Sequence, residues 1–138
     1  MAPSASLLFR WPVRVYYEDT DAGGVVYHAR YLNFCERART EWLRARGWEQ
    51  DALRDEQGVL FVVAGAALEY RRPARFNDLL SVTCEVVRLR AAGIEFVQRV
   101  ERSADSSVLC EVSVRVACVD AETFRPKPMP VPILESFA

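Results

Sequence analysis

The sequence has very little of several residue types on which common functions depend. Among its 138 residues there is one histidine, His28, and one lysine, Lys127. The four cysteines form no Cys-x-x-Cys pair, and a single histidine cannot complete a common zinc-finger pattern. We therefore expect no metal site. The formal net charge of -1 gives no general attraction to nucleic acid or to an anionic membrane, so we expect neither as a partner.

Long apolar runs are also missing. The longest, Val59 to Leu68, is interrupted by Gly65 and is too short to cross a bilayer. The first eight residues have no basic segment and no long apolar stretch, so we expect no signal peptide and no direct membrane insertion. Reduced cysteines are the default for such a chain, and we predict a cytoplasmic protein with free thiols that are buried as small hydrophobes.

The residues that are present predict a single domain over 1–138, with residues 1–9 as a flexible arm and 125–138 as a Pro-rich tail. Apolar residues at spacings of four and three predict one long helix over 31–46, ended by Gly47. A shorter helical segment is expected over 49–56, and a last one over 133–137. Period-two alternation or apolar runs predict strands over 11–17, 59–71, 80–90, 94–102 and 108–118.

These elements predict an α+β domain in which one long helix packs against a curved antiparallel sheet of about five strands. The run over 59–71 is largely apolar, which is typical of a strand buried on both faces. Hairpins are expected around Gly93 and over 103–107. Such a sheet leaves edges that invite pairing, so we predict a homodimer with a continuous sheet, or a homotetramer built from two dimers.

Residues 16–31 combine two aspartates, two glycines and the histidine between a predicted strand and the long helix. Unpaired N–H groups and the positive end of the helix dipole lie at such a helix start, which makes it a plausible place for chemistry. Gly23 and Gly24 let the backbone approach a substrate closely. Taken alone, Asp21 is better explained as a turn or helix-cap aspartate, and Asp19 as a turn residue or hydrogen-bond partner.

The tract from Tyr17 to Tyr31, followed by Glu36-Arg-Ala-Arg-Thr-Glu41, resembles the hotdog-fold acyl-CoA thioesterases of the 4-hydroxybenzoyl-CoA thioesterase type. Within that family it is most similar to the YbgC-like branch associated with the Tol–Pal envelope system. The resemblance runs from about Phe9 to the tail and includes Phe61-Val-Val, Glu69-Tyr and Pro73-Ala-Arg75. It implies a hotdog fold and hydrolysis of acyl-coenzyme A to a free acid and CoA, without a cofactor.

The resemblance also implies residue roles. It places the catalytic carboxylate at Asp21, as nucleophile or general base, with support from Tyr17 and His28. It implies that backbone N–H groups around Tyr27 and His28 bind the thioester oxygen, and it puts Gly24, Val26 and Tyr27 near the substrate. From the residues themselves, we add the turn that carries three arginines, since arginine binds the phosphates of CoA well. These arginines are Arg71, Arg72 and Arg75.

Several alternatives stay open at the level of sequence. The arginines also fit a solvated basic turn, and Tyr17 fits a core position on a strand. A Cys35–His28 dyad would need an activated thiolate. Glu36 and Glu41 fit solvated helix charges. The whole chain also fits a hotdog protein that acts on acyl-ACP, a hydratase or dehydratase, or a non-enzymatic partner of acyl carrier protein or of phospholipid synthesis.

Overall fold

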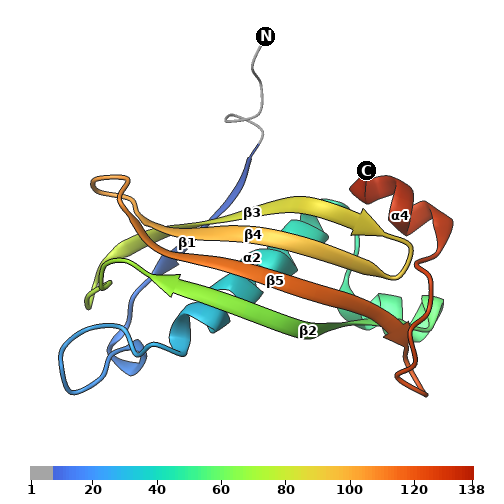
Figure 1. The fold of residues 1–138 in the computed structure, drawn as a ribbon, viewed down its shortest axis with the longest axis horizontal. Coiled ribbons are helices and arrows are strands. Elements are labelled where there is room, and N and C mark those ends of the chain that lie inside the picture. The colour runs from blue at the N-terminus through green and yellow to red at the C-terminus, as the bar shows by residue number, and fades with distance from the viewer. Residues whose placement is uncertain (1–7) are drawn as a thin grey trace, which may run out of the picture.

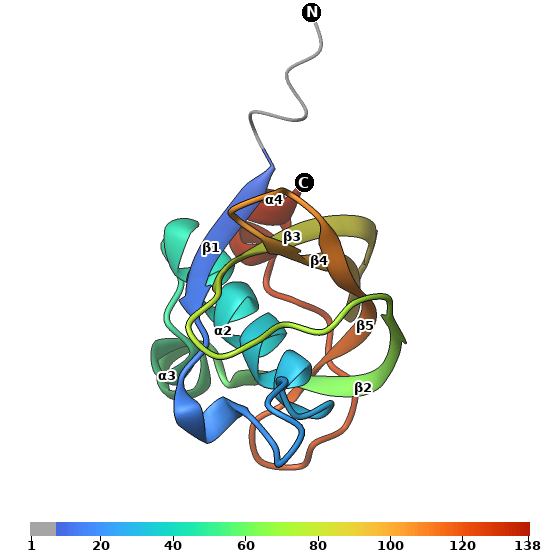
Figure 2. The ribbon, with the colours of Figure 1, turned by 90° about the vertical axis from the view of Figure 1, so that its left-hand side faces the viewer.

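A five-stranded antiparallel sheet curves around one long helix in the computed structural model, which describes residues 8–138 (Figure 1). The helix is α2 (Arg30–Ala45), and Figure 2 shows it lying inside the curve of the sheet. The strands are β1 (Phe9–Arg14), β2 (Val59–Tyr70), β3 (Leu79–Arg90), β4 (Gly93–Arg102) and β5 (Val108–Asp120), in the spatial order β1-β3-β4-β5-β2. The α+β arrangement predicted from the sequence is confirmed.

Shorter helical pieces lie at the ends of this framework. They are the 3₁₀ turn η1 (Tyr17–Asp19), α3 (Gln50–Ala52), the π-helical turn η2 (Leu53–Gln57) and α4 (Val131–Phe137). The segment predicted over 49–56 is thus divided between α3 and η2, and the last helix begins two residues earlier than expected. None of the helices in residues 8–138 is long and apolar enough to span a membrane.

Helix α2 begins one residue before the predicted position and ends one residue earlier, at Ala45. Gly47 follows with φ of +89°, a left-handed conformation that suits glycine after a helix. Phe34, Cys35 and Ala38 on its inner face have no exposed surface. Ala45, the last apolar residue at these spacings, is exposed.

Strand β2 is where the prediction of burial on both faces is wrong. Val59 is completely buried, but Val63 is 53% exposed, and most of the strand beyond it is exposed or only half-buried. β2 pairs with β5 along one side and forms one edge of the sheet. An apolar run gives the composition of a strand, and it does not show whether other elements cover both faces of that strand.

The N-terminal prediction also needs correction. The first strand covers Phe9–Arg14 instead of 11–17, and Phe9, predicted as part of the arm, pairs with Cys84 on β3. The residues beyond Arg14 leave the sheet, and Tyr17–Asp19 form a 3₁₀ turn. The rest of the predicted arm, residues 1–7, lies outside the described residues.

The cysteines are free and buried, as predicted. Burial raises the pKa of the Cys35 and Cys84 thiols to about 12, and that of Cys110 and Cys118 to about 11. All four therefore stay neutral at physiological pH and pack as small apolar side chains.

Candidate active site

The loop before α2 lies against the basic turn that follows β2. The amide of Val26 donates to the carbonyl of Ala74 at 2.8 Å, and Val25 forms an isolated bridge with Arg75. This pairing brings two predicted parts of the site together in an open cleft of about 230 Å³. The cleft is lined by Val26, His28, Tyr31, Tyr70, Arg71, Arg72 and Pro73.

Asp21 lies at the tip of that loop, exposed to solvent and outside the lining of the cleft. Its Oδ1 accepts a hydrogen bond from the Gly23 amide at 2.8 Å, and its own amide donates to the Val25 carbonyl at 2.9 Å. Gly24 follows with φ of +79°, a conformation that glycine adopts without strain. Asp21 therefore has the geometry of a turn aspartate, with Oδ2 making no hydrogen bond within residues 8–138.

Asp19, two residues earlier, has the opposite environment. It is 3% exposed and accepts a hydrogen bond from the Tyr16 amide at 2.8 Å. Its Oδ1 lies 3.3 Å from Nε of Arg30, the first residue of α2. Asp19 therefore anchors the loop to the helix start, which agrees with its predicted role as a hydrogen-bond partner.

The two aromatic candidates beside Asp21 are separated from each other. The exposed ring of His28 lies 4.4 Å from that of Tyr27, measured between centroids, and the His28 carbonyl accepts a 2.8 Å hydrogen bond from the Tyr70 hydroxyl. Tyr17 is 78% exposed and stacks on Phe76 at 4.5 Å. His28 thus lines the cleft, whereas Tyr17 is neither a core residue nor a lining residue.

Two backbone N–H groups at the start of α2 have no hydrogen-bond partner within residues 8–138. Its N-cap residue, Ala29, has no side chain that could cap the helix, and the first turn carries no acid. The Tyr27 amide donates to the Asp19 carbonyl at 2.8 Å and is therefore occupied. The amides of His28 and Ala29 make no hydrogen bond within the described part of the chain. These two N–H groups are the ones available to an incoming oxygen atom.

The three arginines of the basic turn are exposed but differ in their pairing. Arg71 lies 3.4 Å from Glu69 and 3.9 Å from Glu111, so part of its charge is neutralised. Arg72 and Arg75 form no ion pair with any residue in 8–138. They are therefore the more available of the three for an anionic ligand.

The structure opposes the alternative of a cysteine nucleophile. Cys35 has no exposed surface and faces the sheet, while His28 is exposed in the loop. A thiol whose pKa is raised to about 12 by burial forms almost no thiolate near neutral pH. Within residues 8–138, no three His, Cys, Asp or Glu side chains gather in a way that could hold a metal ion.

Comparison with known proteins assigns the family. Residues 15–137 match the family described as the thioesterase-like superfamily. The chain belongs to the thioesterase-like superfamily. This thioesterase-like chain is 49% identical over 130 residues to the Acyl-CoA thioester hydrolase YbgC of Escherichia coli O6:H1, covering 94% of the chain and 96% of that relative. It is also 49% identical over 129 residues to the Acyl-CoA thioesterase YbgC of Haemophilus influenzae, covering 94% and 93% of the two chains.

Solved structures agree on the fold. The crystal structure of a probable thioesterase from Bartonella henselae is 35% identical and superposes with a TM-score of 0.84, covering 89% of this chain and 99% of that one. The family resemblance and the hotdog fold that were expected from the sequence are therefore confirmed.

Two lining residues of the cleft, Tyr31 and Tyr70, were not predicted as site residues from the sequence of this thioesterase-like chain. Tyr31 accepts a hydrogen bond from the Ala74 amide at 3.1 Å, and its ring meets that of Tyr70 edge-on at 5.5 Å. Tyr31 is the first apolar residue at the helical spacings, and Tyr70 lies within the strand predicted over 59–71. Their meeting depends on the pairing of the loop with the basic turn, for which the sequence has no local signal.

Proposed function

We propose that this chain hydrolyses acyl-CoA thioesters and that Asp21 supplies the reactive carboxylate. The names of two relatives at 49% identity, an acyl-CoA thioester hydrolase and an acyl-CoA thioesterase, support the substrate class. The observation that favours Asp21 over Asp19 is their difference in environment. Asp19 is buried and committed to Tyr16 and Arg30, whereas Asp21 is exposed with an unbonded Oδ2 among residues 8–138.

Two routes use an exposed carboxylate of this kind. Asp21 either attacks the thioester carbonyl, which forms a mixed anhydride and releases the CoA thiolate, or removes a proton from a water molecule that attacks instead. A thiol with a pKa of about 8.5 leaves readily, so a strong general acid is less important than in amide hydrolysis. The hydrogen bond from Gly23 holds Asp21 Oδ1, and Oδ2 makes no hydrogen bond within residues 8–138.

The negative charge that develops on the carbonyl oxygen needs donors. We assign this role to the amides of His28 and Ala29, since they are unbonded within the described residues and stand at the positive end of the α2 dipole. Backbone donors fixed in this way contribute about 10²–10³ in rate when they point at the oxyanion. The His28 side chain lines the neighbouring cleft, where it can orient a water molecule.

The phosphates of CoA fit the basic turn beside the cleft. Arg72 and Arg75 carry charges that no carboxylate in residues 8–138 neutralises, and Arg71 carries one that is partly neutralised. Guanidinium groups bind phosphate through paired hydrogen bonds. The turn pairs with the loop at Val25 and Val26, so the proposed phosphate site lies beside the loop that leads into α2.

We also infer that two copies of the chain pair through β2, and that the partner copy completes the active site at this interface. β2 is a 12-residue edge strand with exposed small or apolar side chains at Val63, Ala64, Ala66 and Ala67, and exposed strand edges of this kind pair readily. Light scattering should give a dimer or a tetramer. Ala66→Lys should reduce the mass to that of a monomer, and Ser113→Lys on the inner strand β5 should not. A wild-type monomer with full turnover would contradict the inference.

The test of the proposed function is a substrate panel of short, long and aromatic acyl-CoA thioesters, with thiol release as the readout. We expect hydrolysis of at least one class, and a kcat lower by about 10²–10⁴-fold in Asp21→Asn. Hydrolysis at the wild-type rate by a folded Asp21→Asn would overturn the role of Asp21. Absence of hydrolysis on every acyl-CoA thioester would overturn the proposed function.

The same panel separates the rival functions. Acyl-ACP and enoyl-CoA substrates would identify an acyl-ACP thioesterase or a hydratase. Stable retention of acyl carrier protein without any hydrolysis would favour the non-enzymatic role. The association with the Tol–Pal envelope system stays a prediction.

A further inference from the structure

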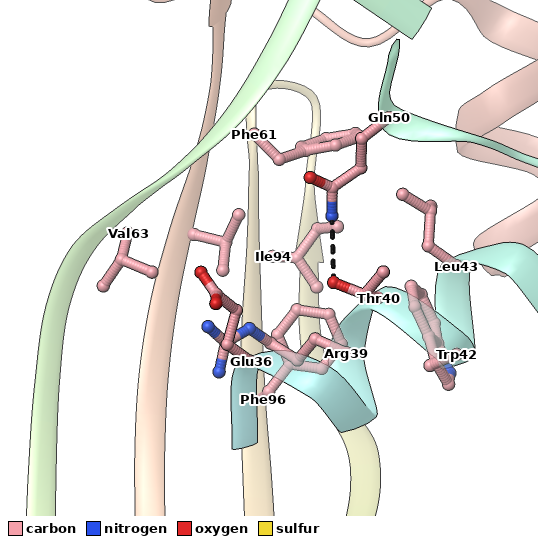
Figure 3. Close-up of a pocket in the computed structure, with 11 residues that line it drawn as sticks. Glu36, Arg39, Thr40, Trp42, Leu43, Gln50, Phe61, Val63, Ile94 and Phe96 are labelled. Carbon is pink, nitrogen blue, oxygen red and sulfur yellow. Dashed lines mark hydrogen bonds between the residues drawn. The ribbon is translucent and has the colours of Figure 1, made fainter. Parts of the chain in front are cut away.

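A second hollow, which the proposed mechanism does not use, lies between the middle of α2 and the sheet (Figure 3). Its volume is about 140 Å³, and it is separate from the cleft at the start of the helix. The edge strand β2 contributes Phe61 and Val63, so the hollow adjoins the proposed interface between copies. The lining residues that matter here are Glu36, Arg39, Trp42, Phe61, Ile94 and Phe96.

Arg39 is the unusual member of this lining. Burial lowers the pKa of its guanidinium, and no ion pair neutralises it within residues 8–138. Nη1 donates to Oε1 of Gln98 at 2.9 Å, and Gln98 is completely buried. Nε2 of Gln98 in turn donates to the Cys35 carbonyl at 3.0 Å. Gln98 therefore fixes the position of a partly desolvated cation, whose charge a buried carboxylate would normally neutralise.

Most of the remaining wall is apolar and includes three aromatic rings, although Glu36, Thr40 and Gln50 also line it. Trp42, Ile94 and Phe96 are at most 3% exposed, and Figure 3 shows Phe61 across the cavity from the helix. Mostly apolar walls with a few polar or charged groups are the usual composition of a small-molecule site. The volume is close to that of a cavity that holds benzene, about 150 Å³, so it admits a stem of about four or five carbons.

We propose that this cavity binds a carboxylate carried on a short apolar stem, with the carboxylate on Arg39 and the stem against the aromatic wall. A planar guanidinium recognises a carboxylate through charge-assisted hydrogen bonds. Such a carboxylate has two sources: the far end of an acyl group whose thioester is being cleaved, or the free acid that hydrolysis releases. Both sources rest on the proposed function, but binding of the carboxylate itself does not.

Glu36 provides a second test of the proposal, because its charge should affect carboxylate binding in the opposite direction to that of Arg39. It lies one turn before Arg39 on α2 and also lines the cavity, so its negative charge opposes an incoming anion. Its electrostatic effect on Arg39 is in the direction expected for such a neighbour, since it raises the guanidinium pKa. Removal of this charge should therefore favour the carboxylate, whereas removal of the Arg39 charge should disfavour it.

The direct experiment is a titration of intrinsic fluorescence, because Trp42 lies in the cavity wall. Pentanoate should bind about tenfold or more tightly than pentan-1-ol, which has the same stem without the charge. Arg39→Met should abolish this preference, and Glu36→Gln should increase it several-fold. Arg37→Met is the matched control, since Arg37 is exposed on the same helix and does not line the cavity.

Loss of Arg39 leaves Oε1 of Gln98 without its donor, which threatens the fold. The double variant Arg39→Met/Gln98→Leu removes both polar groups and should also bind the acid and the alcohol equally. Equal affinities for pentanoate and pentan-1-ol in the wild type would overturn the proposal. An undiminished preference in a folded Arg39→Met or double variant would overturn it as well.

Kinetics then distinguish the two sources. If the acyl group supplies the carboxylate, the mono-CoA thioester of a dicarboxylic acid should have a higher kcat/KM than its methyl-ended match, and Arg39→Met should remove the difference. If the free acid supplies it, pentanoate should inhibit hydrolysis of the methyl-ended substrate in the wild type but not in Arg39→Met. If no acyl-CoA is hydrolysed, the proposed function fails, while the titration still decides whether the cavity binds a carboxylate.

Discussion

The loop before α2 and the buried face of α2 adjoin each other in the chain and differ in almost every physical property. In the loop, Asp21 and His28 are exposed, and backbone hydrogen bonds hold the chain in place. On the helix face, Phe34, Cys35 and Ala38 have no exposed surface and are held by packing. The difference separates two kinds of residue: exposed loop residues such as Asp21 can change chemistry at little cost in stability, whereas those of the helix face determine stability.

The largest contrast is expected in thiol reactivity. Burial raises the pKa of Cys35 to about 12, so its thiolate fraction at pH 8 is about a thousandfold below that of an unfolded cysteine. Iodoacetamide should therefore leave the native cysteines unmodified while it labels the unfolded chain, as mass spectrometry would show. Rapid native labelling of Cys35 would mean that the helix face is as accessible as the loop.

The same burial predicts how stability depends on pH. Unfolding returns the thiols to their ordinary pKa of about 9. As the pH rises, the cysteines of the unfolded chain therefore lose their protons at a lower pH than those of the folded chain. The contribution of the buried, neutral thiols to the free energy of unfolding is complete below pH 9 and is lost as the pH rises from 9 towards 12. Urea unfolding at pH values from 9 to 12 should give a free energy of unfolding that falls as the pH rises.

A substitution on the helix face should affect stability and leave chemistry almost unchanged. Phe34→Ala removes a completely buried ring and should lower the free energy of unfolding by about 3–5 kcal/mol. The kcat of the protein that remains folded should stay near that of the wild type. Urea unfolding and thiol-release assays on the same preparation measure both. A large loss of kcat at unchanged stability would erase the distinction between the two regions.

The smallest expected effects concern the basic turn beside the loop. Arg72→Gln should raise the KM for acyl-CoA by about threefold to fivefold at low salt, since exposed ion pairs contribute less than about 1 kcal/mol. Arg71→Gln should raise it less, because Glu69 and Glu111 already neutralise part of that charge. Neither change should alter stability. An equal effect of both substitutions, or an effect on kcat alone, would contradict binding of phosphate at this turn.

Periodicity in the sequence predicted α2 to within a residue, and period-two alternation or apolar runs predicted all five strands, because burial of one face imposes a regular spacing. The order of the strands was not readable. The apolar run of β2 suggested burial on both faces, but Val63 on this edge strand is exposed. Strand order depends on pairing between distant segments, which local composition does not encode.

The candidate site was only partly predictable. The resemblance identified the loop, the run of arginines indicated the basic turn, and the structure brings Val26 and His28 to one cleft with Arg71 and Arg72. Tyr17, in contrast, stacks on Phe76 outside that cleft. Arg39 was missed, although it follows Cys35 by one helical turn and so lies beside the apolar stripe. A charged residue at such a position usually extends to solvent, and only the buried Gln98 on β4 explains why this one does not.

The central claim is that the two acids of the loop have divided roles, and one paired measurement tests it. Asp21→Asn and Asp19→Asn are compared for kcat and for the free energy of unfolding. We predict that Asp21→Asn lowers kcat by about 10²–10⁴-fold at unchanged stability, since it keeps an oxygen for the Gly23 amide. Asp19→Asn should lower the free energy of unfolding by about 1–3 kcal/mol, because it weakens the contacts to Tyr16 and Arg30. Full turnover in Asp21→Asn, or a collapse of its stability without a loss of kcat in the folded protein, would contradict the account.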